Sequence, residues 1–71
     1  MVEVEQKQLR FGTIAIEKGF ITKEQLMDAI GIQVGDELEQ RAHRRIGTIL
    51  FDLGYISHHQ IDEVLKEMDK G

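Results

Sequence analysis

The sequence contains no cysteine and no proline. The absence of cysteine excludes disulfide bonds and thiolate-ligated metal sites. The absence of proline, together with the lack of any low-complexity stretch, leaves no mark of an internal domain boundary. A chain of 71 residues is therefore expected to form one domain around one small core. Because so small a core contributes little stability, a homodimer or a larger protein partner is an expected source of further stability.

Long apolar runs and a positive net charge are also absent. No apolar segment approaches the ~18 residues that a membrane-spanning helix needs, so no membrane insertion is expected. Residues 1–6 are acidic where a secretory signal would be basic and then apolar, which favours a cytoplasmic location. The net charge of −4 argues against DNA, RNA or an anionic membrane as partner, because counterion release needs a cationic face. It still permits one small anion held by a few arginines.

The most informative feature that is present is an internal repeat with an offset of 35 residues. Segment 10–22, Arg-Phe-Gly-Thr-Ile-Ala-Ile-Glu-Lys-Gly-Phe-Ile-Thr, returns at 45–57 as Arg-Ile-Gly-Thr-Ile-Leu-Phe-Asp-Leu-Gly-Tyr-Ile-Ser. Two related units in one short chain predict a pseudo-symmetric pair that offers two similar half-sites.

Each unit has the pattern of a helix, a tight turn and a second helix. Gly19 is placed as a left-handed C-terminal cap, and Thr22 with Gln25 predicts a capping box for the next helix. The second unit repeats these signals with Gly54 and with Ser57 and Gln60. Apolar residues at helical spacing complete the expected inner faces: Phe11, Ile14, Ala15, Leu26, Ala29, Ile30, Ile46, Ile49, Leu50, Leu53, Ile61, Val64, Leu65 and Met68. Gln33 is a further candidate for the buried stripe.

The predicted fold class is all-α, a small four-helix domain built from two helix–turn–helix units with pseudo-two-fold symmetry. In the segment after the first unit, good helix formers follow Gly31 and Gly35, so we expect the helix to continue, with a bend. A separate short helix after Gly35 is the alternative. The expected organisation is a flexible N-terminal segment at 1–7 and a single helical domain at 8–71, with repeat units at 10–33 and 45–68 and a linker at 34–44.

Two residues of each unit, an arginine and a glycine, repeat without serving the predicted core. Arg10 and Arg45 each stand two residues before a glycine, Gly12 or Gly47, which we expect in the first turn of the first helix of each unit. A guanidinium group binds phosphate or a guanine edge, a glycine permits close approach, and free amides at a helix N-terminus suit an anion. This pattern predicts a phosphate or nucleotide site presented twice. The alternative is that the arginines are solvated or paired with acidic neighbours and that the glycines allow close helix packing, because Arg-x-Gly is a weak motif.

Both units resemble the pattern Arg-Leu-Gly-x-x-Leu-x-x-x-Gly-x-x-x-x-x-x-Leu-x-x-x-Leu-x-x-Gln. This is the tandem signature of the MshEN-like N-terminal domains of type II secretion and type IV pilus assembly ATPases. The chain departs from it at Met68, which replaces the terminal Gln of unit two, and in its longer linker. The matching residues are Arg10, Gly12, Gly19, Leu26 and Gln33 in unit one, and Arg45, Gly47, Leu50, Gly54 and Leu65 in unit two.

The resemblance implies a bacterial, all-helical, non-enzymatic regulatory or adaptor module. Since several members of the family bind cyclic di-GMP, it implies this nucleotide as a regulatory ligand, with no cofactor. The implied roles are guanine or phosphate binding by Arg10 and Arg45, close approach at Gly12 and Gly47, a hydrogen bond from Gln33, and an apolar wall of Leu26, Leu50, Ile61 and Leu65. The alternative function is a docking module without a nucleotide, whose partner is a protein of a secretion, pilus or signalling system.

Motifs of catalysis are missing. No Gly-x-x-x-x-Gly-Lys-Ser/Thr loop is present, and Ser57 is better explained as a helix cap than as a nucleophile. His58 and His59 are adjacent, so on a helix they point about 100° apart and do not share one metal ion easily. We therefore expect neither an enzyme nor a metal site.

Overall fold

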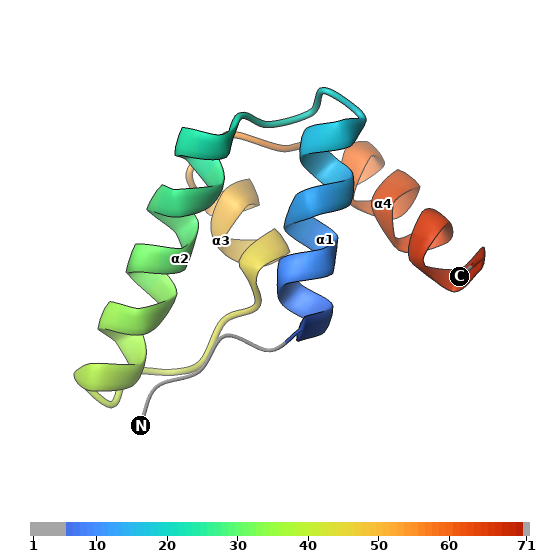
Figure 1. The fold of residues 1–71 in the computed structure, drawn as a ribbon. Helices are drawn as coiled ribbons and strands as arrows, with labels where there is room; N and C mark the ends of the chain where they lie inside the picture. The colour runs from blue at the N-terminus through green and yellow to red at the C-terminus, as the bar shows by residue number, and fades with distance from the viewer. Residues whose placement is uncertain (1–5, 71) are drawn as a thin grey trace.

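The computed structural model describes residues 6–70, which form four helices and no strand (Figure 1). The predicted all-α class is confirmed. None of the helices in this part of the chain is long and apolar enough to cross a membrane. The helices are α1 (Gln6–Glu17), α2 (Lys23–Leu38), α3 (Ile46–Asp52) and α4 (His58–Lys70).

The turns that end α1 and α3 are copies of one another. Gly19 and Gly54 have φ angles of +77° and +81°, which only glycine adopts without strain. In each unit the glycine amide donates to the carbonyl three residues earlier, and the next amide donates to the carbonyl five residues earlier, which is the Schellman motif. These bonds, each 2.9 Å long, are Gly19–Ile16, Phe20–Ala15, Gly54–Phe51 and Tyr55–Leu50. The predicted C-terminal caps are confirmed.

The second helix of each unit starts with the predicted capping box. Thr22 Oγ1 accepts from the amide of Gln25 at 3.1 Å, and Gln25 Oε1 accepts from the amide of Thr22 at 2.9 Å. Ser57 and Gln60 form the same reciprocal pair at 3.1 and 3.0 Å. Each box satisfies two backbone donors that a helix start leaves without partners.

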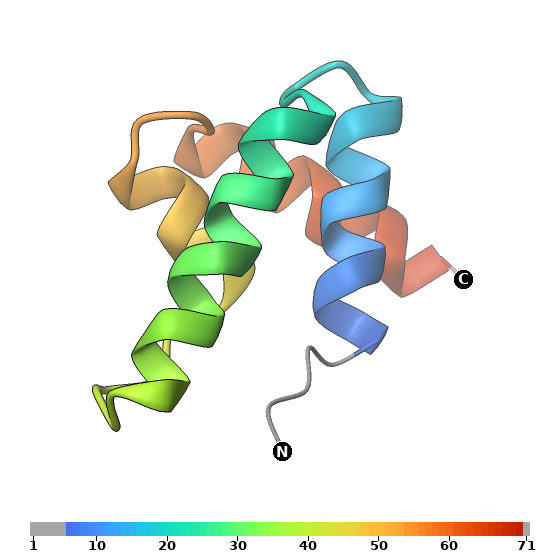
Figure 2. The ribbon, with the colours of Figure 1, turned by 60° about the vertical axis from the view of Figure 1, so that its left-hand side comes forward.

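The two units interleave. In Figure 1, α3 and α1 lie in the middle, and α2 and α4 lie at the outer edges; Figure 2 gives a second view of the same arrangement. The main helix contacts are α1 with α3, α2 with α3, and α1 with α4. Each first helix therefore packs on the other first helix and on the second helix of the other unit. This set of pairs is unchanged when the units are exchanged, as a pseudo-two-fold arrangement requires.

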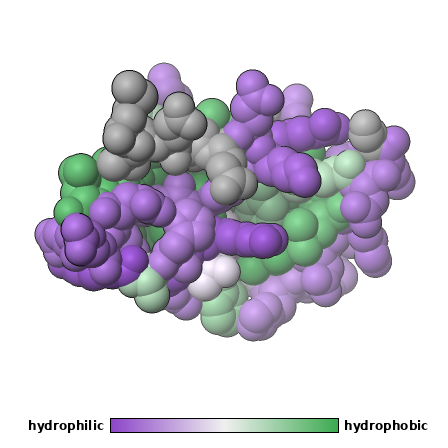
Figure 3. All heavy atoms as spheres, turned by 90° about the horizontal axis from the view of Figure 1, so that it is seen from below, coloured by the Kyte–Doolittle hydropathy of each residue, from purple (hydrophilic) through white to green (hydrophobic). Residues whose placement is uncertain are grey.

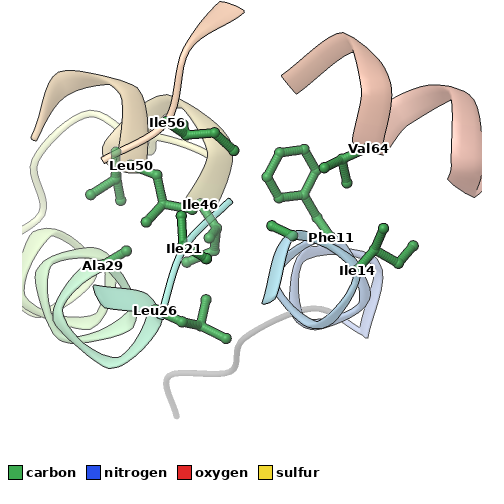
Figure 4. Close-up of a cluster of buried hydrophobic side chains, with 11 residues drawn as sticks. Phe11, Ile14, Ile21, Leu26, Ala29, Ile46, Leu50, Ile56 and Val64 are labelled. Atoms are coloured by element: carbon green, nitrogen blue, oxygen red, sulfur yellow. The ribbon is translucent and has the colours of Figure 1, made fainter. Parts of the chain in front are cut away.

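The core lies where these helices meet (Figure 4). Ala29 of α2 points toward α3, Leu26 of α2 lies against Gly12 of α1, and Phe11 of α1 points toward Val64 of α4. Helix α3 has only seven residues, so its stability comes from burial rather than from length. The buried apolar residues are Phe11, Ile14, Ala15, Ile21, Leu26, Ala29, Ile46, Ile49, Leu50, Ile56 and Val64.

Two leucines that were predicted to face inward are exposed. Leu53 is 39% exposed because α3 ends at Asp52, so that Leu53 is the C-cap residue and lies beyond the last helical residue. Leu65 is 46% exposed because it lines an open groove beside α4. The inward prediction was wrong for both residues.

The helix boundaries differ from the predicted organisation at two places. Helix α2 runs without interruption through Gly31 and Gly35 to Leu38, which confirms that the helix continues into the predicted linker. Helix α1 begins at Gln6, so residues 6 and 7 belong to it rather than to an N-terminal segment. The rest of the predicted flexible segment, residues 1–5, lies outside the described residues.

Ion pairs hold the connection between α2 and α3. The buried carboxylate of Asp36 accepts from Arg44 at 3.0 Å and from Arg41 at 3.5 Å. Arg44 also donates to Asp52 at 3.1 Å, and these hydrogen bonds raise the pKa of Arg44. Because a buried carboxylate is costly without partners, the two arginines fix the connecting segment against the end of α2.

Candidate binding groove

An open groove of about 910 Å³ lies between the first half of α1, the start of α3, and α4. Its volume is in the range of pockets that hold small ligands. Figure 3 shows apolar surface between polar side chains on the half of the molecule where α1 and α4 lie. The apolar lining consists of Phe11, Ile46, Gly47, Ile61, Leu65 and Met68. The polar lining consists of Lys7, Gln8, Arg10, His43, Arg45, Thr48 and Asp69.

The rim of the groove is cationic although the chain is acidic. Lys7, Arg10 and Arg45 line it with a single carboxylate, Asp69, whereas the whole chain has a net charge of −4. Within residues 6–70, none of these three cations is in a salt bridge. The linker arginines, in contrast, are engaged by carboxylates. The groove is therefore a local site of positive potential with an apolar floor.

The structure brings together only part of the predicted nucleotide site. Five of the predicted residues line the groove, namely Arg10, Arg45, Gly47, Ile61 and Leu65. The other four, Gly12, Leu26, Gln33 and Leu50, are buried in the helix packing. The arrangement therefore offers one half-site on the α4 side, whereas its counterpart on the α2 side is taken up by protein contacts.

Gln33 is a structural residue rather than an open ligand contact. Its side chain is 3% exposed, and Nε2 donates to Gln8 Oε1 and, at 2.8 Å, to the backbone carbonyl of Arg44. Gln8 Oε1 also accepts from the amide of Ile46 at 3.1 Å. The Gln8–Gln33 pair thus ties α1 and α2 to the start of α3. The Ile46 amide, part of the helix start that we expected to be free for an anion, is already bonded.

The two repeated glycines have different surroundings. A Cβ atom on Gly12 would lie 2.5 Å from Cδ1 of Leu26, so this glycine allows close packing of α1 and α2. Gly12 also lies well inside α1 rather than in its first turn, because α1 begins at Gln6. A Cβ atom on Gly47 would lie 3.0 Å from Cζ of Phe11, and Gly47 does lie in the first turn of α3. The packing alternative is therefore confirmed for Gly12.

Differences between matched residues explain why only one half-site is open. Leu26 packs over Gly12, whereas over Gly47 the space is occupied by the ring of Phe11 rather than by Ile61, the counterpart of Leu26. The counterpart of Gln33 is Met68, which has no amide to tie α4 to its neighbours. The α4 side consequently keeps its apolar residues at the surface.

Eight residues of the groove lining were not among the predicted site residues, and Lys7 and Gln8 are two of them. Both fall in or next to the segment that was expected to be flexible. Gln8 lies three residues before Phe11 and seven before Ala15, so it shares their inward face of α1. That spacing was the signal that could have identified it as a buried residue.

No protein-family model, curated protein or solved structure matches the chain. A function is therefore inferred from the groove and from the residues that line it.

Proposed function

We propose that the chain is a non-enzymatic docking module and that the groove between α1, α3 and α4 binds a segment of a protein partner. The observation that carries this proposal is that the exposed Leu65 lies beside the half-buried Ile61 and Met68 in one groove of so small a domain. Apolar surface rimmed by polar groups is typical of interaction sites. The resemblance to MshEN-like domains supports a bacterial secretion, pilus or signalling system as the setting.

Selection from a displayed library of random peptides tests this function. The bait is the wild-type chain, and each enriched peptide is then measured against two variants. Leu65→Glu places a charge in the groove, whereas Leu38→Glu places one at a residue that is 68% exposed at the end of α2 and is not part of the groove. We expect enriched peptides that lose affinity at least tenfold with Leu65→Glu and keep it with Leu38→Glu. No enrichment, or enrichment insensitive to Leu65→Glu, would contradict the docking function.

Cyclic di-GMP is the second candidate ligand, and the convergence of Arg10 and Arg45 in one groove favours it. Against it stands the burial of Leu26 and Gln33, which removes the second half-site. A calorimetric titration with cyclic di-GMP, run beside GTP, decides between the candidates. Micromolar binding of cyclic di-GMP alone, weakened in Arg45→Ala by about 1.5–3 kcal/mol, would establish a nucleotide receptor. The docking function predicts no heat of binding for either nucleotide.

A further inference from the structure

We infer that the segment that docks in the groove is an amphipathic helix whose polar edge is acidic. This inference rests on the proposed docking function and specifies the chemistry of the partner. It follows from three features of the groove: the secondary structure of its walls, the line of its apolar residues, and the sign of its rim.

The walls favour a helical partner over an extended one. Between residues 6 and 70 there is no strand, so the groove has no sheet edge with which an extended segment could pair. Away from the first turn of α1 and the last turn of α4, the backbone groups of these two walls are bonded within their own helices. An extended segment would leave its own amides and carbonyls without partners on an apolar floor, which is costly. A helix satisfies these groups internally.

The apolar residues of α4 form one line along the groove. Ile61, Leu65 and Met68 are spaced at i, i+4 and i+7, so they share one face of α4. The buried ring of Phe11 and the buried side chain of Ile46 add to the floor. A ridge of this kind packs against the apolar stripe of another helix.

The charges of the rim select the sign of the partner. Lys7 and Arg10 lie at i and i+3 on α1, and Arg45 immediately precedes α3, so the cations gather on the α1 and α3 side. Asp69 is the one carboxylate of the lining and lies on α4. An acidic helix edge facing α1 and α3 gains attraction there, while the net charge of −4 disfavours its binding elsewhere.

Three synthetic helical peptides of about 18 residues test the inference, since shorter helices are marginal in water. All three have the same leucine stripe, and their polar positions are Glu, Gln or Lys. Each is titrated into the 15N-labelled full chain at low and at high salt while the amide signals are followed by NMR. We expect the Glu peptide to shift the amides of residues 45–48 and 61–69 and to bind at least tenfold tighter than the Gln peptide. We also expect the added salt to reduce this difference.

Charge-reversal variants provide the matched control. Arg45→Glu is expected to lower the affinity of the chain for the Glu peptide at least tenfold and to raise its affinity for the Lys peptide. Lys23→Glu makes the same change of charge at an exposed residue that is not part of the groove, and it is expected to leave all three affinities unchanged.

The remaining outcomes separate this inference from the docking function. Equal binding of the Glu and Gln peptides, or tighter binding of the Lys peptide, at the groove amides would overturn the acidic partner and leave the docking function standing. If no peptide shifts a groove amide, the helical partner is overturned, and the selection from the random-peptide library then decides whether the docking function stands. If the groove amides shift with protein concentration alone, the occupant is a second copy of the chain and the inference fails.

Discussion

Glycine shows how the surroundings of a single residue determine its role in this chain. Gly19 and Gly54 are needed for their backbone angles, which follow from local sequence and were predicted. Gly12 is needed because Leu26 lies against it, and Leu26 is fourteen residues away in the sequence and on another helix. Nothing in the Arg-x-Gly pattern distinguishes a packing glycine from a ligand-binding one. The local roles were therefore predictable, and the tertiary one was not.

Replacement of either turn glycine should destabilise the fold. Gly19→Ala and Gly54→Ala each force a Cβ atom into a left-handed conformation, which costs about 1–2 kcal/mol. Urea denaturation should show a loss of this size in the free energy of unfolding for each variant. Because the two turns have the same hydrogen bonds, a large loss at one position and none at the other would contradict their equivalence.

The same substitution should destabilise the fold at one helical glycine and have almost no effect at another. In Gly12→Val the new side chain meets Leu26, and overpacking of this kind costs about 1–3 kcal/mol. In Gly31→Val no atom lies within 4 Å of the new Cβ, so the free energy of unfolding should change by less than about 0.5 kcal/mol. Equal effects in thermal denaturation would show that Gly12 is not held in a tight contact.

At the scale of the element, helix termini that local sequence determines were easier to predict than a helix start that depends on a tertiary contact. The capping boxes and Schellman motifs are local, and the structure has all four where they were expected. The start of α3 has no side-chain cap of its own, since Arg45 makes no capping hydrogen bond. Its first amide is bonded instead by Gln8 from α1, which local sequence does not indicate.

Gln8 should therefore be important for stability although it is polar. Gln8→Leu leaves the Ile46 amide without its acceptor and removes one of the two acceptors of Gln33 Nε2, and an unpaired buried donor costs roughly 1–3 kcal/mol. Hydrogen exchange of the Ile46 amide should also accelerate. Gln6→Leu, at an exposed residue of the same helix, is the control and should change stability little. If Gln8→Leu changed neither the free energy of unfolding nor the hydrogen exchange of the Ile46 amide, the bridging role of Gln8 would be refuted.

At the scale of the whole molecule, the repeat predicts equivalence, and a few matched differences break it. The four helices and the exchange of packing partners follow from the repeated pattern. The open groove follows from Phe11 where unit two has Ile46, and from Met68 where unit one has Gln33. These differences were visible in the sequence, but their effect depends on how side chains fill the space between helices. For this reason, five of the predicted site residues reach the groove and the other four do not.

Neighbouring residues of α4 should separate stability from binding. Val64 is fully buried, and Val64→Ala removes two methyl groups and leaves a cavity, so it should lower the free energy of unfolding by roughly 2–3 kcal/mol. Leu65→Ala shortens a side chain that is about half exposed and should cost less, about 1 kcal/mol or below. A large loss for Leu65→Ala in urea denaturation would mean that Leu65 belongs to the core and is not available to a partner.

Of the two repeated half-sites, the one beside α4 is open and the one beside α2 is closed. Paramagnetic relaxation of the methyl signals by a soluble gadolinium chelate tests this difference directly, because the effect reports the access of solvent to each methyl group. Leu65 should relax more strongly than its counterpart Ile30, and Ile61 more strongly than its counterpart Leu26, which is 8% exposed. Equal relaxation within both pairs would show that the two half-sites are equally accessible to solvent, which would contradict an open half-site beside α4 and a closed one beside α2.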